Sequence, residues 1–485
     1  MKDNIRYSVI VNLIKTLVLT LLSFISFPHV CAALGAEVMG TYTWANTFVF
    51  YFLIIAKSGI PNIAIRECSK VKDDKIALSK KVQEFFIIQA IHTILAFTLM
   101  CIGVFSVKEL FEWKDLIFIL SINFLVSTFS FEWLFIALEK HYFISLRSIA
   151  TLATCSLLII SLVRRPTDLY LYSFLAILST ILNVIINVFC LKKYVTFKYV
   201  GPYEFKSYLK PIFVVFIISL MLTLYNSTDT FILGFLDKSK SQVANYSVGV
   251  KSIEIIIALI TSLDAVFIPR ATRYFKMDNK YFFNNLTRYG FNICLFIAIP
   301  AIASMSMLSH QITNIISGGS VEYQEAPIVL IILVSMSLTF SLSDMIYEQV
   351  LLPMKKEKYY LYTLLLGAIL NIGGSIYLGN IFKEYNNPAI GVAIATMLTD
   401  IIVLINLIVV TKEYVIKALF NKNTLKLFIG GISVLISSFI IAYVIPLNND
   451  IVKIILTVCI SAFIYIGVLA LLKEDLVYSF IKKKE

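Results

Sequence analysis

Residues 169–191 read LYLYSFLAILSTILNVIINVFCL, a stretch of 23 residues without Asp, Glu, Lys or Arg. As an α-helix rising 1.5 Å per residue it is about 34 Å long, enough to cross a hydrocarbon core of about 30 Å. Its apolar residues run on without the strict alternation of a barrel strand. A backbone in lipid must satisfy its own hydrogen bonds, so the stretch predicts a membrane-spanning helix.

Comparable apolar runs recur along all 485 residues, of which 59% are hydrophobic and only 15% charged. A soluble globular protein carries about 25% charged residues. We therefore predict an all-α integral membrane protein with about 14 transmembrane helices, joined by segments too short to form a catalytic domain outside the bilayer. The predicted spans are residues 9–34, 42–65, 85–107, 115–138, 144–163, 169–191, 211–236, 243–267, 286–308, 326–352, 357–379, 388–411, 424–445 and 451–472.

The net charge of +12 arises from basic residues in the short connecting segments and not from a soluble basic domain, which argues against a nucleic-acid partner. With the N-terminus inside, 31 Lys and Arg residues lie in or beside the cytoplasmic segments and 8 lie in the external ones. This asymmetry follows the positive-inside rule. We expect both termini to be cytoplasmic.

The chain repeats part of its pattern after about 200 residues. Leu34-Gly35 and Gly40-Thr41-Tyr42 precede or open one predicted span, and Leu233-Gly234 and Ala244-Asn245-Tyr246 do the same in the second half. An offset of six helices gives two copies of the same orientation, related by an axis along the membrane normal. We therefore predict a six-helix lobe over 1–191, a cytoplasmic linker over 192–210, a second six-helix lobe over 211–411, and two additional helices with a cytoplasmic tail over 412–485.

Three lysines lie deep inside predicted spans: Lys15, Lys57 and Lys251. A charge at the bilayer centre costs about 2.5–3.5 kcal/mol even on a lenient insertion scale, so such residues point to function. Because ammonium groups bind phosphate well, we hypothesise that these lysines attract a pyrophosphate headgroup. Arg66 and Arg270 are further headgroup candidates. The alternative for Lys15 and Lys57 is that they extend to the membrane interface.

Carboxylates and amides also occur inside the spans. Asp344 and Glu348 are four residues apart and share a helix face, which suggests ion coupling or hydrogen bonding to neighbouring helices. Glu254 follows Lys251 by three residues, so a structural ion pair is an alternative to a role in transport. The remaining residues predicted to line a polar cavity or to couple an ion are Asp229, Asn12, Asn46 and Asn226.

Motifs of soluble enzymes and metal sites are absent from the sequence. It contains neither a G-x-x-x-x-G-K-[ST] loop nor H-E-x-x-H, and its seven cysteines show no C-x-x-C spacing. We expect no bound metal and no cofactor.

Several short motifs resemble those of the Wzx-type polysaccharide flippases, within the multidrug/oligosaccharidyl-lipid/polysaccharide exporter superfamily. In the first half these are Leu34-Gly35 with Gly40-Thr41-Tyr42, and Ser58-Gly59-Ile60-Pro61 followed by Arg66-Glu67. In the second half they are Thr228-Asp229-Thr230, Leu233-Gly234 with Tyr246, Ile268-Pro269-Arg270, and the segment NPAIGVAIAT at 387–396.

The resemblance implies two six-helix lobes around a cationic cavity and alternating access in a bacterial plasma membrane. It implies an undecaprenyl-pyrophosphate-linked oligosaccharide as cargo, coupling to a proton or sodium gradient, and a polysaccharide polymerase and chain-length regulator as partners in capsule or O-antigen synthesis. Two alternatives stay open: a multidrug or small-cation antiporter of the same fold, and a membrane glycosyltransferase or polymerase of the same pathway. Lysines stand where some relatives carry cavity arginines.

Overall fold

The computed structural model describes residues 2–261, 264–277, 279–447 and 449–482, and every element in these ranges is helical. Thirteen of the described helices are long and apolar enough to cross a membrane. One of them, Val18–Lys70, is 53 residues long and is interrupted at Gly35, so it offers length for two crossings. The prediction of an all-α membrane protein with about 14 spans is confirmed.

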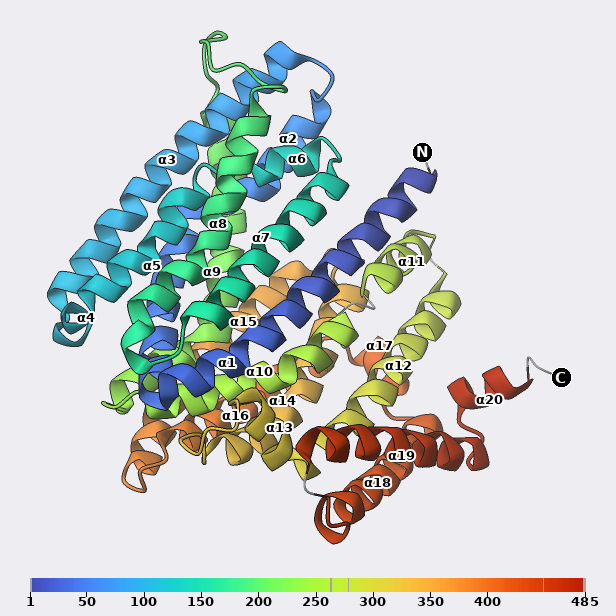
Figure 1. Cartoon of the computed structure of the whole chain (residues 1–485). Coiled ribbons are helices and arrows are strands. Elements are labelled where there is room, and N and C mark those ends of the chain that lie inside the picture. Colours follow the sequence, from blue (N-terminus) through green and yellow to red (C-terminus); the bar gives the residue numbers. More distant parts are fainter. Residues whose placement is uncertain (1, 262–263, 278, 448, 483–485) are drawn as a thin grey trace. The chain divides into compact units, whose positions relative to one another are not determined.

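The chain divides into two compact units, Met1–Ser227 and Thr228–Glu485. Unit 1 contains α1 (Lys2–Lys57), α2 (Ile60–Lys70), α3 (Lys75–Ser106), α4 (Lys108–Glu112), α5 (Lys114–Ser127), α6 (Glu132–Ala137), α7 (His141–Leu162), η1 (Pro166–Asp168), α8 (Leu169–Leu191) and the first part of α9 (Lys206–Leu236). Figure 1 shows the long helices of unit 1 running side by side, and α1 packs on α3, α5 and α7.

Unit 2 begins inside α9 and contains a second set of long helices. Its elements are α10 (Ser241–Thr261), α11 (Asp264–Lys276), α12 (Lys280–Met307), α13 (Ser309–Ile316), α14 (Ala326–Ile346), the π-helical turn η2 (Tyr347–Leu351), α15 (Glu357–Lys383), α16 (Pro388–Val410), α17 (Lys412–Leu419), α18 (Lys422–Phe439), η3 (Ile440–Val444), α19 (Asp450–Leu471) and α20 (Asp475–Lys482). Within this unit α14 packs on α10 and α16, and α18 packs on α12 and α19.

The span predicted over 42–65 is wrong at its end, because α1 stops at Lys57 and a short helix begins anew at Ile60. The span predicted over 243–267 includes residues 262 and 263, which lie outside the described residues. In unit 1 the break has a clear cause, because Ser58 and Gly59 take left-handed φ angles of 41° and 70°. Pro61 in the first turn of α2 favours a helix start there.

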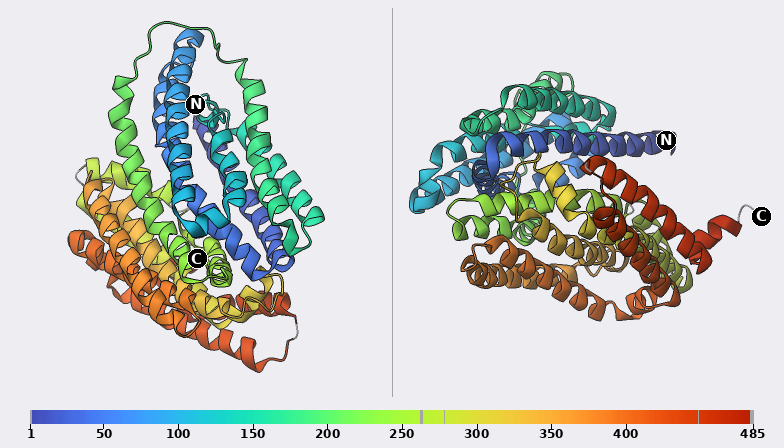
Figure 2. Two further views of the ribbon diagram at one scale, coloured as in Figure 1. Left: turned by 90° about the vertical axis from the view of Figure 1, so that its left-hand side faces the viewer. Right: turned by 60° about the horizontal axis from the view of Figure 1, so that its bottom comes forward.

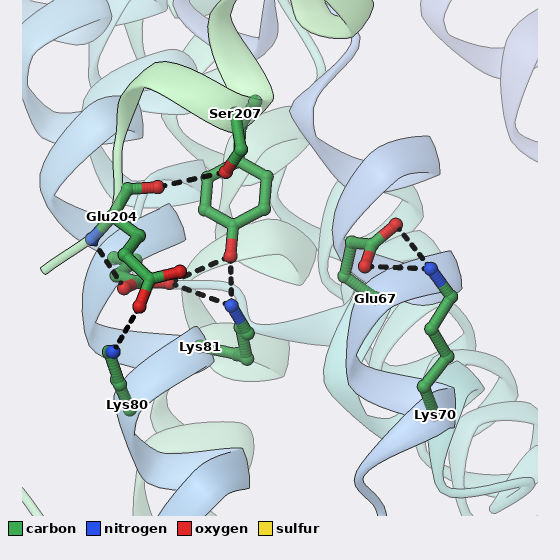
Figure 3. Close-up of polar contacts among 8 residues, drawn as sticks. Glu67, Lys70, Lys80, Lys81, Glu204 and Ser207 are labelled. Atoms are coloured by element: carbon green, nitrogen blue, oxygen red, sulfur yellow. Dashed lines mark hydrogen bonds and ion pairs between the residues drawn. The ribbon is translucent and has the colours of Figure 1, made fainter.

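The linker between α8 and α9 passes over the N-terminal end of α3 (Figure 2) and is bonded to it. Gln83 donates to the carbonyls of Thr196 and Lys198 at 2.8 and 2.9 Å. The buried Glu84 carboxylate accepts from the Glu204 amide at 2.8 Å and from the Tyr208 hydroxyl at 3.0 Å (Figure 3). Residues 196–208 are therefore hydrogen-bonded to α3, and we call this segment the strap. Its last residues belong to α9.

Apolar packing supports the same end of unit 1. Side chains of α2, α3 and α6 meet the end of α8 and the start of α9 around the fully buried Phe85 and Leu134. The charged Glu84 sits beside this core, where only a carboxylate with its hydrogen bonds satisfied is tolerated. The strap is thus held both by apolar burial and by buried hydrogen bonds.

Candidate functional site

A charged cluster in unit 1 combines one exposed and one buried cation. Lys57 is the last residue of α1 and is exposed. Glu132, the first residue of α6, interacts electrostatically with Lys57 and lies 3.6 Å from the Arg147 guanidinium. The side chain of Arg147 is only 3% exposed, whereas that of Glu132 is 42% exposed. Lys57 is therefore the exposed cation of the cluster and Arg147 the enclosed one.

Local backbone geometry fixes this cluster. The left-handed Ser58-Gly59 turn ends α1 at Lys57, and Phe131 with φ 44° sets the start of α6 at Glu132. Asn187 on α8 accepts from the Arg147 guanidinium and donates to the Ser130 carbonyl, which ties α7 and α8 to the turn before Glu132. Arg147 thus balances the charge of Glu132 from the buried side.

Unit 2 contains a buried polar network around Asp229. Asp229 on α9 is 4% exposed and accepts a hydrogen bond from the Tyr246 hydroxyl of α10. The Thr396 hydroxyl of α16 lies 3.4 Å from the same carboxylate oxygen, and Asn371 of α15 donates to that hydroxyl at 3.4 Å. Asp400, one turn after Thr396 and 1% exposed, interacts electrostatically with Tyr246. Two buried carboxylates therefore belong to one network of four helices.

A second pair of carboxylates lies at the end of α14 and in the turn that follows it. Asp344 is in the last turn of α14 and Glu348 is in the π-helical turn η2, and the two carboxylates interact with each other. Both are half-buried, and both interact electrostatically with Tyr360 at the start of α15. Like charges at this spacing repel, so a bound cation or proton would stabilise the pair.

The other residues predicted in unit 1 do not join its charged cluster through any interaction that the structure gives. Arg66 is 59% exposed and pairs with its neighbour Glu67 at 3.1 Å. Lys15 is half-buried on α1, and Asn46 and Asn226 are exposed. The side chain of Asn12 lies outside the described residues.

The predicted site residues of unit 2 do not lie together in one cluster. Lys251 lies 2.6 Å from Glu254, the geometry of the structural-pair alternative. Arg270 is exposed on α11. Asp229 is the one predicted residue inside the buried network, and no group of three or more His, Cys, Asp or Glu that could hold a metal occurs among the described residues.

Sequence reasoning missed Arg147, Glu132 and Asp400. Arg147 lies one turn inside a predicted span, where it resembles a flanking charge of the positive-inside pattern. Asp400 lies in the middle of the span predicted over 388–411, and a carboxylate at that depth was the available signal. Glu132 lies inside the span predicted over 115–138, so the same signal was available, but its place beside Lys57 and Arg147 depends on a turn that hydropathy does not reveal.

Comparison with known proteins adds two findings. Residues 5–275 match the model of a family described as polysaccharide biosynthesis protein. The structure described as "Lipid II flippase MurJ, inward closed conformation" matches with a TM-score of 0.75 and 18% identity, covering 96% of this chain and 99% of that chain. At this identity the likeness shows the fold alone. No curated protein sequence matches the chain.

Proposed function

The chain belongs to the polysaccharide biosynthesis protein family, and we propose that it is a transporter that moves a lipid-linked oligosaccharide across the membrane. The family match over residues 5–275 carries this proposal. A fold shared with a protein described as a lipid II flippase supports it, since lipid II flipping is also movement of a lipid-linked molecule. The chain acts without a catalytic site, as a flippase and not as an enzyme.

The cargo in this proposal is an undecaprenyl-pyrophosphate-linked repeat unit. It moves from the inner to the outer leaflet of a bacterial plasma membrane by alternating access, with both termini of the chain in the cytoplasm. The oligosaccharide then serves capsule or O-antigen synthesis, with a polymerase and a chain-length regulator as downstream partners.

Lys57 is the best-supported contact for the pyrophosphate. It is exposed, whereas the Arg147 guanidinium that balances Glu132 is buried. Because Arg147 offsets part of the negative charge of Glu132, the potential around Lys57 stays positive. A compact ammonium is a suitable partner for phosphate. Glu132 then tunes affinity: it competes with the headgroup for Lys57 and favours its release.

Coupling to a proton or sodium gradient belongs to the buried network of unit 2. Asp229 is withdrawn from solvent and is bonded to Tyr246, with Thr396 close by. A buried carboxylate without a cation gains most from binding a proton or ion, and the three helices that meet at Asp229 would repack as it does so. Asp344 and Glu348 form a second candidate for the same role.

The test is flipping by the purified chain in proteoliposomes that carry fluorescent undecaprenyl-pyrophosphate oligosaccharide. Proteoliposomes with the chain should expose inner-leaflet substrate to an external lectin or quencher faster than protein-free liposomes. An imposed proton or sodium gradient should raise the rate. Equal rates with and without protein, under either gradient, would contradict the proposal.

A further inference from the structure

A polar pocket lies at one end of unit 2. It forms where α13, the loop over 317–325 and the first residue of α19 meet, and α13 packs on both α14 and α19. Its volume is about 340 Å³, at the small end of the range of about 300–1,000 Å³ for ligand pockets. The distribution of basic residues predicts that this end of the unit is external.

Amide and hydroxyl groups dominate the lining. The polar side chains that line the pocket include His310, Gln311, Asn314, Ser317, Gln324 and Asp450. Amides and hydroxyls each offer both a donor and an acceptor, which is also the bonding capacity of a sugar hydroxyl. No Lys or Arg lines the pocket within the described part of the chain, and Asp450 adds a carboxylate, so the pocket disfavours phosphate.

Several contacts hold the pocket in shape. Asn314 donates to the Asp450 carboxylate at 2.6 Å, which joins α13 to α19. The loop turns through Gly318 and Gly319, with φ of 67° and 78°, and the Gly319 amide donates back to the Asn314 carbonyl at 2.7 Å. The Cβ position of Gly319 has no atom within 4 Å, so the loop leaves open space beside it.

One lining group has unused bonding capacity. The side-chain oxygen of Gln311 is shielded from solvent and accepts no hydrogen bond from any residue the structure describes. A buried polar atom left without a partner costs about 1–3 kcal/mol, so a rotation of the Gln311 amide that turns this oxygen into the pocket to accept from a ligand would be favoured. A sugar hydroxyl supplies the donor.

We propose that this pocket is a sugar-binding subsite, which holds one or two neutral sugar rings of the translocated oligosaccharide on the external side. The inference rests on the proposed function. Of the three parts of such a cargo, the pyrophosphate needs cations and the lipid needs an apolar surface. The hydroxyl-rich glycan is the part that matches amides, hydroxyls and the buried Tyr323 at the pocket wall. Holding the glycan outside disfavours its return.

The experiment has a binding arm and a transport arm. The binding probe is the oligosaccharide released by mild acid from the lipid-linked pool of cells expressing the chain. Its affinity for the full-length protein in nanodiscs is measured by saturation-transfer NMR. Asn314→Ala, at an exposed position, and Gln311→Leu, which keeps the volume, should each weaken binding about tenfold by removing hydrogen bonds. The matched control is Asn380→Ala, because that exposed amide donates to its own helix at Ile376.

The transport arm separates the two possible sources of the sugar. A slower rate of net exposure of the fluorescent lipid-linked substrate in Asn314→Ala, together with weaker binding, would support the subsite. Weaker binding with an unchanged rate would overturn the assignment to the cargo and give the pocket to free polysaccharide. Unchanged binding in both variants would overturn the sugar site itself. A wild-type chain that binds the oligosaccharide but moves no lipid would refute the proposed function and not the pocket.

Discussion

Replacing Glu84 by Gln tests whether the strap over 196–208 is held by buried hydrogen bonds. Glu84 is fully buried and accepts from the Glu204 amide at 2.8 Å and the Tyr208 hydroxyl at 3.0 Å (Figure 3). Hydrogen bonds to a charged group contribute about 1.5–3 kcal/mol and neutral ones about 0.5–1.5 kcal/mol. The neutral amide keeps one acceptor oxygen for the Glu204 amide and places its NH2 group against the Tyr208 hydroxyl, which then accepts. Replacing each charge-assisted bond by a neutral one weakens it by about 1–1.5 kcal/mol, so the strap loses about 2–3 kcal/mol.

Limited digestion with trypsin, which cleaves after Lys198 inside the strap, measures how often the strap detaches. Because about 1.4 kcal/mol corresponds to a factor of ten, the population with a detached strap should rise roughly 30- to 140-fold. The rate of cleavage rises by the same factor as long as the strap closes again faster than trypsin cleaves it. The matched control is Glu67→Gln, which disrupts a pair with the 60% exposed Lys70. Such surface pairs contribute at most about 1 kcal/mol, so cleavage at Lys198 should not change. Cleavage of the Glu84 variant at the wild-type rate would show that these hydrogen bonds do not hold the strap.

Three further changes test other parts of the structure. Asp229→Asn keeps the size of the buried side chain but cannot ionise, so flipping should become independent of an imposed gradient, measured in proteoliposomes. Gly59→Ala places a Cβ 2.5 Å from Val215 at φ 70° and should destabilise unit 1 by about 2–4 kcal/mol in thermal unfolding, whereas Gly373→Ala, with open space around its Cβ, should not. The hydrogen bond from Lys80 lowers the pKa of Glu204 below its usual 4.5, so this surface pair adds to the stability of the strap above pH 4.5, and that contribution is lost as pH falls through the lowered pKa. Amide exchange of residues 196–208, corrected for intrinsic rates, should show that loss of protection in acid.

Much of the fold follows from hydropathy alone, because long apolar runs have few alternatives in a bilayer. Hydropathy fails to place the break at Ser58-Gly59. The residues there stay apolar enough to extend a predicted span, yet the backbone turns and starts a short helix. Two consecutive residues with left-handed φ angles end α1, and mean hydropathy carries no information about backbone angles.

The candidate site was predictable only where a charge stands out in an apolar run. Lys57 and Asp229 were found in this way, whereas their partners were not. Glu132 reaches Lys57 through the turn at Phe131, and Tyr246 and Thr396 reach Asp229 from other helices. Periodicity places residues on a helix face, but it does not say which faces of distant helices meet.

We propose that this chain flips a lipid-linked oligosaccharide and holds its pyrophosphate at Lys57. The most direct measurement compares flipping of undecaprenyl-pyrophosphate oligosaccharide by the wild type, Lys57→Ala and Glu132→Gln. The control is Lys72→Ala, because that lysine pairs with Glu139 away from the cluster. We expect transport by the wild type and the control, at least a tenfold loss in Lys57→Ala, and tighter substrate binding in Glu132→Gln. Equal rates for Lys57→Ala and the wild type would contradict the headgroup site, and no transport by any of the four would contradict the function.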